Sequence, residues 1–327
     1  MRAALLAAAL LLSGCESMQY YAQAIGGQLS IMRAARPVET WLADPDTPQD
    51  LRGRLALARE IREFAARELA LPRNGSYESY AALGRPYVAW NVYAAPAFST
   101  EAKQECFPLV GCVSYRGFFA EADARQHAEK LRLAGNDVYI GAVPAYSTLG
   151  WFDDPLLSTF IRFPDAQLAR LLFHELAHQV AYARDDTAFN ESFAVSVEEE
   201  GVRRWLRAQG REKEIAAFSA AQSRRRELAA RVEAARKRLE AVYKSDVPEA
   251  EKRRVKAREF EALRADFGNV VPAEPTNAFL VSIAVYTELV PAFERLLAES
   301  GGDLGAFYKR VKDLAREDKK TRSLALR

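Results

Sequence analysis

The residues best suited to metal binding or catalysis are His174, Glu175 and His178, which stand in the sequence His-Glu-Leu-Ala-His. Only 3 histidines occur in the 327 residues, and two of them belong to this H-E-x-x-H pattern, so chance explains it poorly. Side chains four residues apart lie about 6 Å apart on one face of a helix, so both imidazoles can reach one metal ion at about 2.1 Å. The spacing therefore predicts a zinc site with Glu175 beside it for acid–base chemistry.

The surrounding segment has the pattern of a mostly buried helix. Pro164 suits a first helical position, and Asp165 complements the positive end of the helix dipole. An apolar face follows at helical spacing: Leu168, Leu171, Leu172, Leu176 and Val180. A core or surface role is the alternative for each histidine taken alone, but the constellation favours a metal site.

Two histidines and a water do not complete a zinc site, so a third protein ligand is expected. The remaining histidine, His127, lies in a charged amphipathic run, where a solvent-facing side chain is the simpler interpretation. Glu191, in Asn-Glu-Ser-Phe-Ala, is the better candidate, and an ordinary exposed helix glutamate is its alternative.

The expected helices would bring Glu191 to the histidines. We expect the first helix to run to about Ala183, to break in a polar turn and to restart with Asp186 or Thr187 as its N-cap. At about 1.5 Å per residue, two antiparallel helices would then hold His178 and Glu191 at nearly the same height.

A resemblance to a known family covers nearly the whole chain. Residues 190–194, N-E-S-F-A, are similar to the N-E-x-F-A of the aminopeptidase branch of the gluzincin metallopeptidases, although the gap from His178 to Glu191 is shorter than in those enzymes. With the H-E-x-x-H pattern, four further segments resemble the bacterial putative aminopeptidase family, long described as a domain of unknown function. These segments are L-S-G-C at 12–15, C-F-P-L-V-G-C at 106–112, Y-R-G at 115–117 and Y-S-T-L-G-W-F-D-D-P at 146–155.

The resemblance implies hydrolysis of peptide bonds. Zn²⁺ held by His174, His178 and Glu191 would keep a fourth position for water and lower the pKa of that water towards about 7. Glu175 would take the proton of the water and return it to the leaving amine. Related enzymes stabilise the intermediate with a Tyr or His from elsewhere in the chain, and the candidates here are Tyr286 and Tyr115. A buried Tyr with a structural hydrogen bond is the alternative for each of the two.

The resemblance also implies a place for the substrate. Gluzincins usually pair the substrate peptide with an edge strand before the zinc helix. Residues 148–152 could form that edge, with Gly150 permitting close backbone approach beside Trp151, and an ordinary turn is the alternative. An aminopeptidase also needs a carboxylate for the α-amine of its substrate. The candidates are Asp153, Asp154 and Glu198.

The first residues predict export and a lipid anchor. Met1 and Arg2 precede residues 3–12, all Ala or Leu, an apolar core too short to span a bilayer and typical of a signal peptide. The following L-S-G-C resembles a bacterial lipobox, in which Cys15 is lipidated; a plain signal peptide is the alternative. We therefore expect a signal peptide over 1–14, a zinc metallopeptidase domain over 15–327, and a periplasm-facing protein held to the membrane through Cys15. Glu16 favours the outer membrane.

Export also bears on the oxidation state of the other two cysteines. Cys106 and Cys112 lie close in sequence and would face an oxidising compartment, which favours a disulfide. A second metal site is the alternative, but no histidine lies nearby.

Composition and periodicity predict an α+β, mostly helical fold with a small mixed sheet, and the resemblance makes it zincin-like. Strands at 87–93, 113–119 and 137–143, with a helix at 121–134 capped by Gly135, suggest a parallel crossover. Residues 212–266 predict long charged helices that form a projecting helical hairpin. Their interleaved Glu residues and the net charge of +2 favour a solvated face and no nucleic acid as partner.

Peptide is the expected substrate, and two other functions remain open. The chain could be an endopeptidase that acts on envelope proteins, which would need an open cleft and no α-amine carboxylate. It could also be a zinc-stabilised lipoprotein scaffold without turnover, which would need a closed fourth position on the zinc.

Overall fold

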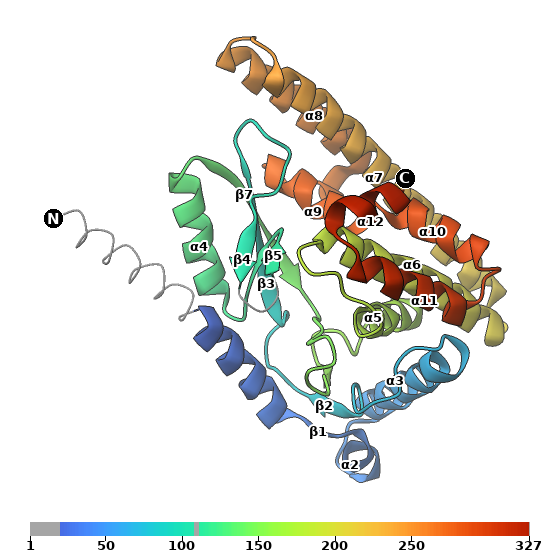
Figure 1. The fold of residues 1–327 in the computed structure, drawn as a ribbon. Helices are drawn as coiled ribbons and strands as arrows, with labels where there is room; N and C mark the ends of the chain where they lie inside the picture. Colours follow the sequence, from blue (N-terminus) through green and yellow to red (C-terminus); the bar gives the residue numbers. More distant parts are fainter. Residues whose placement is uncertain (1–19, 108–110, 327) are drawn as a thin grey trace.

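The computed structural model describes residues 20–107 and 111–326 (Figure 1). The expected signal peptide and Cys15 lie outside the described residues, as do residues 108–110 between the two remaining cysteines. The fold is α+β and mostly helical, with small sheets, as composition and periodicity predict.

Helices make up most of the chain. The first described helix covers residues 20–34. The others follow in chain order: α2 (Val38–Ala43), α3 (Gln49–Glu68), α4 (Glu121–Leu133), α5 (Asp165–His178), α6 (Thr187–Ala208), α7 (Glu212–Lys244), α8 (Glu249–Phe267), the 3-10 turn η1 (Gly268–Val270), α9 (Asn277–Thr287), α10 (Val290–Glu299), α11 (Leu304–Arg316) and α12 (Lys319–Ala325).

Three small sheets accompany them. The first has the order β6 (Arg116–Phe118), β3 (Ala89–Pro96) and β7 (Asn136–Val143), and both pairs are antiparallel. The second has the order β1 (Arg36–Pro37), β2 (Ser79–Ala81) and β8 (Leu156–Leu157), with one antiparallel and one parallel pair. The third is the antiparallel pair β4 (Glu105–Phe107) and β5 (Gly111–Val113).

The predicted strand–helix–strand unit has two strands that run parallel, but these strands do not pair with each other. Because β6 and β7 both run antiparallel to β3, they run parallel to each other, and α4 connects them as a crossover. The intervening β3 takes all the ladder hydrogen bonds, so no parallel pair forms in this sheet. The strand expected at 113–119 is split between β5 and β6. Gly135 follows α4 with a φ of +81°, the left-handed conformation that ends a helix.

Side-chain alternation along β3 gives the sheet two covered faces. Trp90, Val92 and Ala94 pack against α4, whereas Tyr93 and Ala95 pack against α9. Figure 1 shows α4 on the outer side of this sheet and α9 between the sheet and the helical body. The face that carries Tyr93 therefore looks towards the helices that hold the histidines.

The helices α5 and α6 form the centre of the helical body. They pack against each other along their length, with α3, α10 and α11 around them. Phe173 of α5 is fully buried and packs against α6 at Gly201, and Phe193 of α6 is fully buried against Phe293 and Phe307 of α10 and α11. Such packing fixes the relative height of the two helices, and with it the relative position of any side chains at their junction.

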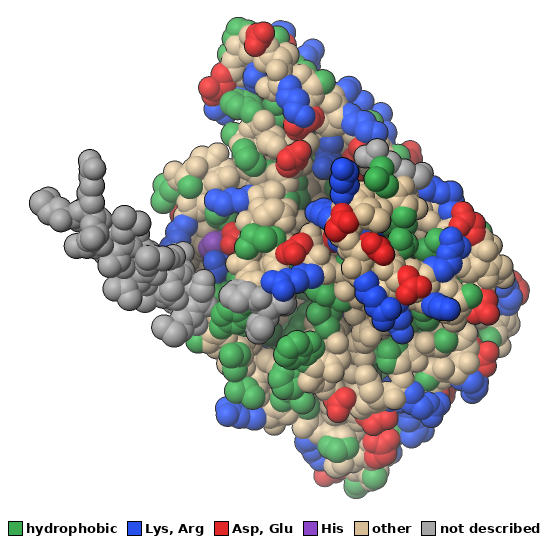
Figure 2. Space-filling model, viewed as in Figure 1, with side chains coloured by type: hydrophobic (Ala, Val, Ile, Leu, Met, Phe, Trp, Pro, Cys, Tyr) green, Lys and Arg blue, Asp and Glu red, His purple; other side chains and the backbone are tan. Residues whose placement is uncertain are grey.

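The charged segment after residue 211 forms α7 and α8. Residues 245–248 connect the two helices, which pack against each other. Leu239, Phe260 and Leu263 belong to an apolar cluster between them, and Arg238 pairs with Glu259 across the outside. Figure 2 shows basic and acidic side chains interspersed over the visible face, so neither sign dominates it. Among the described residues, none of the helices has the length and apolar character needed to cross a membrane.

Candidate metal and catalytic site

The H-E-x-x-H residues form the last turn of α5. His174 and His178 stand one turn apart with ring centroids separated by 4.8 Å, and Glu175 is buried beside them. The helix begins after Pro164, which is its N-cap and not its first helical residue. Its end differs more from expectation, because α5 stops at His178 and not near Ala183.

The side chain of Asn190 explains the early end of α5. Its amide nitrogen donates to the carbonyl of Ala183 at 2.8 Å, and its amide oxygen accepts from the Ala183 N–H at 2.7 Å. The backbone after α5 is therefore held in a turn that a helix could not make. Asn190 is the residue before Glu191, so the same side chain fixes where the carboxylate enters the site.

Asp186 begins α6 as its N-cap, one of the two residues expected there, and accepts from the N–H of Phe189. Its other oxygen accepts from Arg322 of α12 at 3.0 Å, and both side chains are buried. A buried ion pair with this geometry fixes the start of α6 against the C-terminal helices.

Three side-chain atoms converge where α5 and α6 meet. The Nε2 atoms of His174 and His178 lie 3.2 Å apart, and Oε2 of Glu191 lies 3.3 Å from the first and 3.5 Å from the second. Ligands at about 2.0 to 2.1 Å from a tetrahedral zinc lie about 3.3 to 3.4 Å from one another. The three residues are the single metal-binding group found among the described residues, and their spacing would suit such an ion.

A second carboxylate supports this group from behind. Glu198, two turns after Glu191 on α6, lies 3.0 Å from Nδ1 of His174 and 2.8 Å from Arg170. The contact turns Nε2 of His174 towards Glu191 and His178, as carboxylates do for metal-binding histidines. Both oxygens of Glu198 are occupied, so the structure does not favour it as the anchor for a substrate amine.

The acid–base properties of these groups follow from their partners. Burial lowers the pKa of His174, but its hydrogen bonds to Glu191 and Glu198 outweigh burial and raise the pKa to about 10. Burial raises the pKa of Glu191, but the two histidines outweigh it and lower the pKa to about 2. The protein therefore pairs these charges tightly before any ion is added.

Glu175 behaves differently. Burial raises its pKa, and the opposing charges of His174 and His178 do not compensate. Within the described part of the chain its carboxylate has no hydrogen-bond partner. A buried carboxylate with a raised pKa and a free oxygen is suited to accept and release a proton.

Tyrosines from the sheet side face the same group. Tyr115 donates to Oε1 of Glu191 at 3.3 Å, which occupies its hydroxyl with the third candidate ligand. The ring of Tyr286 stacks over that of His174 at 6.3 Å, and its hydroxyl shares a hydrogen bond with Tyr93. Burial raises the pKa of Tyr115 and Tyr286 well above the usual value, so both stay protonated and can donate. Tyr115 is held by a candidate ligand, whereas the partner of Tyr286 is a neutral hydroxyl, so Tyr286 is the better candidate to donate to a substrate.

A cavity of about 1250 Å³ opens in front of these residues. Its wall combines the candidate ligands with segments from the first described helix, the sheet, α7 and the turn after α9. The lining includes Gln28, Asn91, residues 143–149, Arg225, Tyr286 and Glu288. The volume is large enough for a peptide of several residues.

Residues 148–152 do not form the edge strand that the resemblance implied. The Asp154 carboxylate accepts from the N–H and the hydroxyl of Thr148, and Leu149 and Gly150 have left-handed φ angles of +58° and +80°. These contacts close the segment into a turn, the alternative interpretation of the sequence. Gly150, Trp151, Asp153 and Asp154 do not line the cavity. Asp153 and Asp154 are therefore poorly placed to anchor an amine.

The cavity wall offers another segment in place of that strand. Residues 145–147 continue from the end of β7 along the cavity, and no described backbone group pairs with theirs. Such free N–H and C=O groups are available for a peptide laid beside them.

His127 lies apart from the candidate ligands. It belongs to α4 and approaches Glu105 at 3.5 Å, with Arg116 on the other side of the same carboxylate. It is half-buried and not solvent-facing, but its position agrees with the choice of Glu191 over His127 as third ligand.

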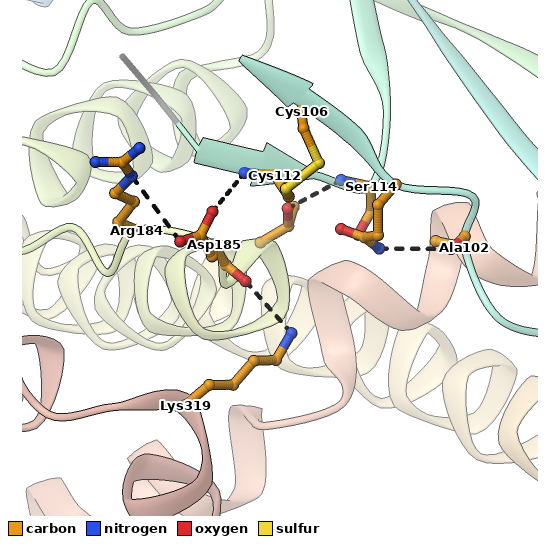
Figure 3. Close-up of a disulfide and its surroundings, with 9 residues drawn as sticks. Ala102, Cys106, Cys112, Ser114, Arg184, Asp185 and Lys319 are labelled. Carbon is orange, nitrogen blue, oxygen red and sulfur yellow. Dashed lines mark hydrogen bonds and ion pairs between the residues drawn. A yellow bond between two sulfur atoms is a disulfide. The ribbon is translucent and has the colours of Figure 1, made fainter. Parts of the chain in front are cut away.

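Cys106 and Cys112 are joined by a disulfide, with their Cα atoms 3.9 Å apart. Figure 3 shows how the disulfide sits against the turn between α5 and α6. The N–H of Cys112 donates to Asp185, the N–H of Ser114 donates to Thr187 at 3.2 Å, and Lys319 donates to the Asp185 carbonyl at 3.3 Å. The disulfide-closed strand pair therefore holds the turn that separates the candidate ligands.

Three residues of this region escaped sequence reasoning, and two of them, Arg225 and Glu288, line the cavity. Tyr93 was hidden in an apolar strand, although its alternation with Val92 and Ala94 was a usable signal. Glu288 follows the candidate Tyr286 by two positions, and Arg225 stands in a run of arginines that resembled a solvated face. Only the packing of α7 and α9 brings the last two to the cavity.

A comparison with known families gives a match over nearly the whole chain. The model of the putative aminopeptidase family matches residues 19–326, and the chain belongs to that family. The family description suggests a peptidase. No curated protein and no solved structure matches the chain.

Proposed function

We propose that this protein is a zinc-dependent aminopeptidase that hydrolyses short peptides. The observation that carries the proposal is the spacing of three possible metal-ligand atoms, Nε2 of His174, Nε2 of His178 and Oε2 of Glu191. They lie 3.2, 3.3 and 3.5 Å from one another. In this proposal α5 and α6 correspond to the two active-site helices of a zincin-like enzyme. Bound zinc would polarise the substrate carbonyl and make the attacking water acidic.

The chain's own residues supply the remaining steps. Glu175 takes the proton of the attacking water, because its carboxylate is free and its raised pKa strengthens it as a base. The same group then passes the proton to the leaving amine. Tyr286 donates to the carbonyl oxygen as negative charge develops there, and Tyr115 and Glu198 hold Glu191 and His174 in place.

Glu288 is our candidate for the α-amine anchor. It lines the cavity beyond Tyr286, and among the described residues it has no ionic partner. A carboxylate there would make a charge-assisted hydrogen bond to a free amino terminus. This favours an aminopeptidase over an endopeptidase.

One experiment separates the possibilities. The purified protein, stripped with a chelator and reloaded with zinc, is given matched peptides with free and acetylated amino termini. We expect zinc-dependent hydrolysis of the free peptides and little of the acetylated ones. In Glu288→Gln this preference is expected to shrink, whereas Glu299→Gln, an exposed change on α10 away from the cavity wall, should leave it intact.

The other outcomes would replace the proposal. Equal rates on both peptide sets would mean that no amine anchor exists and would favour an endopeptidase. Stoichiometric zinc without hydrolysis of any peptide would favour a scaffold.

We also propose that Cys15 is lipidated and that the protein faces the periplasm, attached to the outer membrane. The support is the signal-like start of the chain and the L-S-G-C sequence. Incorporation of a labelled fatty acid, lost in Cys15→Ser, would test the modification, and membrane fractionation would test the location.

A further inference from the structure

Arg225 is a cation on the cavity wall without a carboxylate partner. It lies on α7, and the hydrogen bond found for its guanidinium goes to the neutral amide of Gln222, one turn earlier, at 3.0 Å. The other cations of the wall are paired: Arg170 with Glu198, Arg226 with Glu199 and Glu294, and Lys237 with Glu233. Arg225 therefore differs from each of its basic neighbours.

The charges around Arg225 do not supply that partner. Two carboxylates lie near enough to interact with its charge, Glu198 and Glu199, but both already have partners. Glu198 binds Arg170 and His174, and Glu199 binds Arg226. The side chain of Arg225 is exposed on the cavity wall, so most of its donors are available to an anionic ligand.

Its position ties this charge to the candidate active site. Glu198, which acts on Arg225 electrostatically, also contacts Nδ1 of His174. Arg225 and His174 therefore line the same cavity, and the charge of Glu198 acts on both.

We propose that Arg225 binds a carboxylate group of the substrate. This inference rests on the proposed peptidase function and names its substrate class: peptides that carry a carboxylate a short distance from the cleaved bond. The carboxylate can be the free C-terminus of a di- or tripeptide, or an acidic side chain. A guanidinium suits either because its donors form a planar fork that matches a carboxylate.

A free C-terminus would also set the length of the substrate. A fixed cation near the metal site can meet the C-terminus only when few residues follow the cleaved bond. The cavity wall would then select short peptides at both ends, through Glu288 for the amine and Arg225 for the carboxylate.

The test compares four versions of one peptide: a short peptide with a free C-terminus, its C-terminal amide, and both forms with an acidic side chain introduced. Wild-type zinc-loaded protein is assayed beside Arg225→Met, Arg225→Lys and the control Arg224→Met. Arg224 is adjacent on α7 but does not line the cavity, so its removal changes the charge of the helix equally. The kinetic constants kcat and KM are determined separately.

We expect wild type to prefer the carboxylate-bearing peptides by about 10- to 100-fold in kcat/KM, mostly through KM. Arg225→Met should lose this preference, Arg225→Lys should retain part of it, and Arg224→Met should retain all of it. Preference for the free over the amidated terminus identifies the C-terminus as the source, and preference for the acidic amide identifies the side chain.

Two results would overturn the inference while leaving the proposed function intact: equal kcat/KM for all four peptides in wild type, or an unchanged preference in Arg225→Met. Failure to hydrolyse any peptide with zinc bound would instead refute the proposed function. Thermal unfolding of each variant identifies changes in activity that come from misfolding.

Discussion

The two walls of the cavity differ in how completely their charges are paired. On the wall formed by α5 and α6, the charges of Arg170, His174, Glu191 and Glu198 form one connected chain of contacts. The wall formed by α7 and the turn after α9 also holds paired charges, such as Arg226 and Lys237, but it adds Arg225 and Glu288, for which no ionic partner is found among the described residues.

The difference separates two tasks. Paired charges lock side chains into one geometry, which a metal site requires, and they have little left for a ligand. Arg225 and Glu288 are exposed and, within the described part of the chain, unpaired, so their polar groups remain available for a ligand of opposite charge. The first wall is thus suited to chemistry and the second to selection, and the following predictions test that division.

The largest effect is expected at Glu175, an acidic group of the first wall for which no hydrogen-bond or ionic partner is found among the described residues. Glu175→Gln should lower kcat by about 10²- to 10⁴-fold, because the amide cannot take the proton of the water. Zinc content, measured by metal analysis, should stay near wild type. Turnover within a few-fold of wild type would remove Glu175 from the role of base.

Tyr286 belongs to the second wall but faces His174, so its removal should affect chemistry more than binding. We expect Tyr286→Phe to lower kcat by about 10²-fold with a small change in KM, because one donor to the developing negative charge is lost. Tyr93→Phe is the matched control, since it removes the partner hydroxyl and leaves that of Tyr286. Equal losses in the two variants would contradict a direct role for Tyr286.

Glu198 tests the pairing itself. Glu198→Gln keeps the shape but weakens the contacts to His174 and Arg170, and it should lower zinc affinity by about 10- to 100-fold. The neighbouring Glu199→Gln breaks only contacts to arginines and should leave zinc affinity unchanged. Competition with a chelator measures both, and identical affinities for Glu198→Gln and wild type would argue against the supporting contact.

The smallest effect on activity is expected at Asp154, a buried carboxylate without the cations that surround Glu191 and Glu198. Burial raises its pKa to about 6. The unfolded chain releases the same proton near about 4, so between these values the folded state binds more protons and its stability falls as pH rises.

Asp154→Asn should remove that dependence and leave peptide hydrolysis at neutral pH nearly unchanged, since the amide oxygen still accepts from Thr148. Urea unfolding at pH 4, 5, 6 and 7 gives the free energy of unfolding of wild type and variant. The difference between the two free energies should change with pH. A difference that stays constant with pH would contradict the raised pKa.

The candidate ligands could be predicted from the sequence. Helix periodicity places His174 and His178 on the same face of α5, and the short turn after α5 limits where Glu191 can lie along the neighbouring helix. The end of α5 could not be predicted in this way. It depends on Asn190, whose side chain bonds the backbone of Ala183 and stops the helix at His178. Local propensity favours continuation there, and a contact seven residues away overrides it.

The substrate side of the cavity was less accessible to sequence reasoning. Gly150 and Trp151 look like part of a strand, but Asp154 closes their segment with hydrogen bonds to Thr148. Arg225 and Glu288 lie far from the H-E-x-x-H sequence and have no spacing that marks them. They reach the cavity through packing of whole helices, which single-sequence patterns do not specify.

The ion pair between Asp186 and Arg322 has a consequence for synthesis of the chain. A ribosome delivers residues in order, and the N-cap of the helix that carries Glu191 lacks its buried arginine until residue 322 has emerged. The start of α6 then holds an unpaired buried carboxylate, which leaves it loosely fixed. We therefore expect metal uptake to follow completion of the chain, so that the candidate metal site forms only after the last helix has packed against α6.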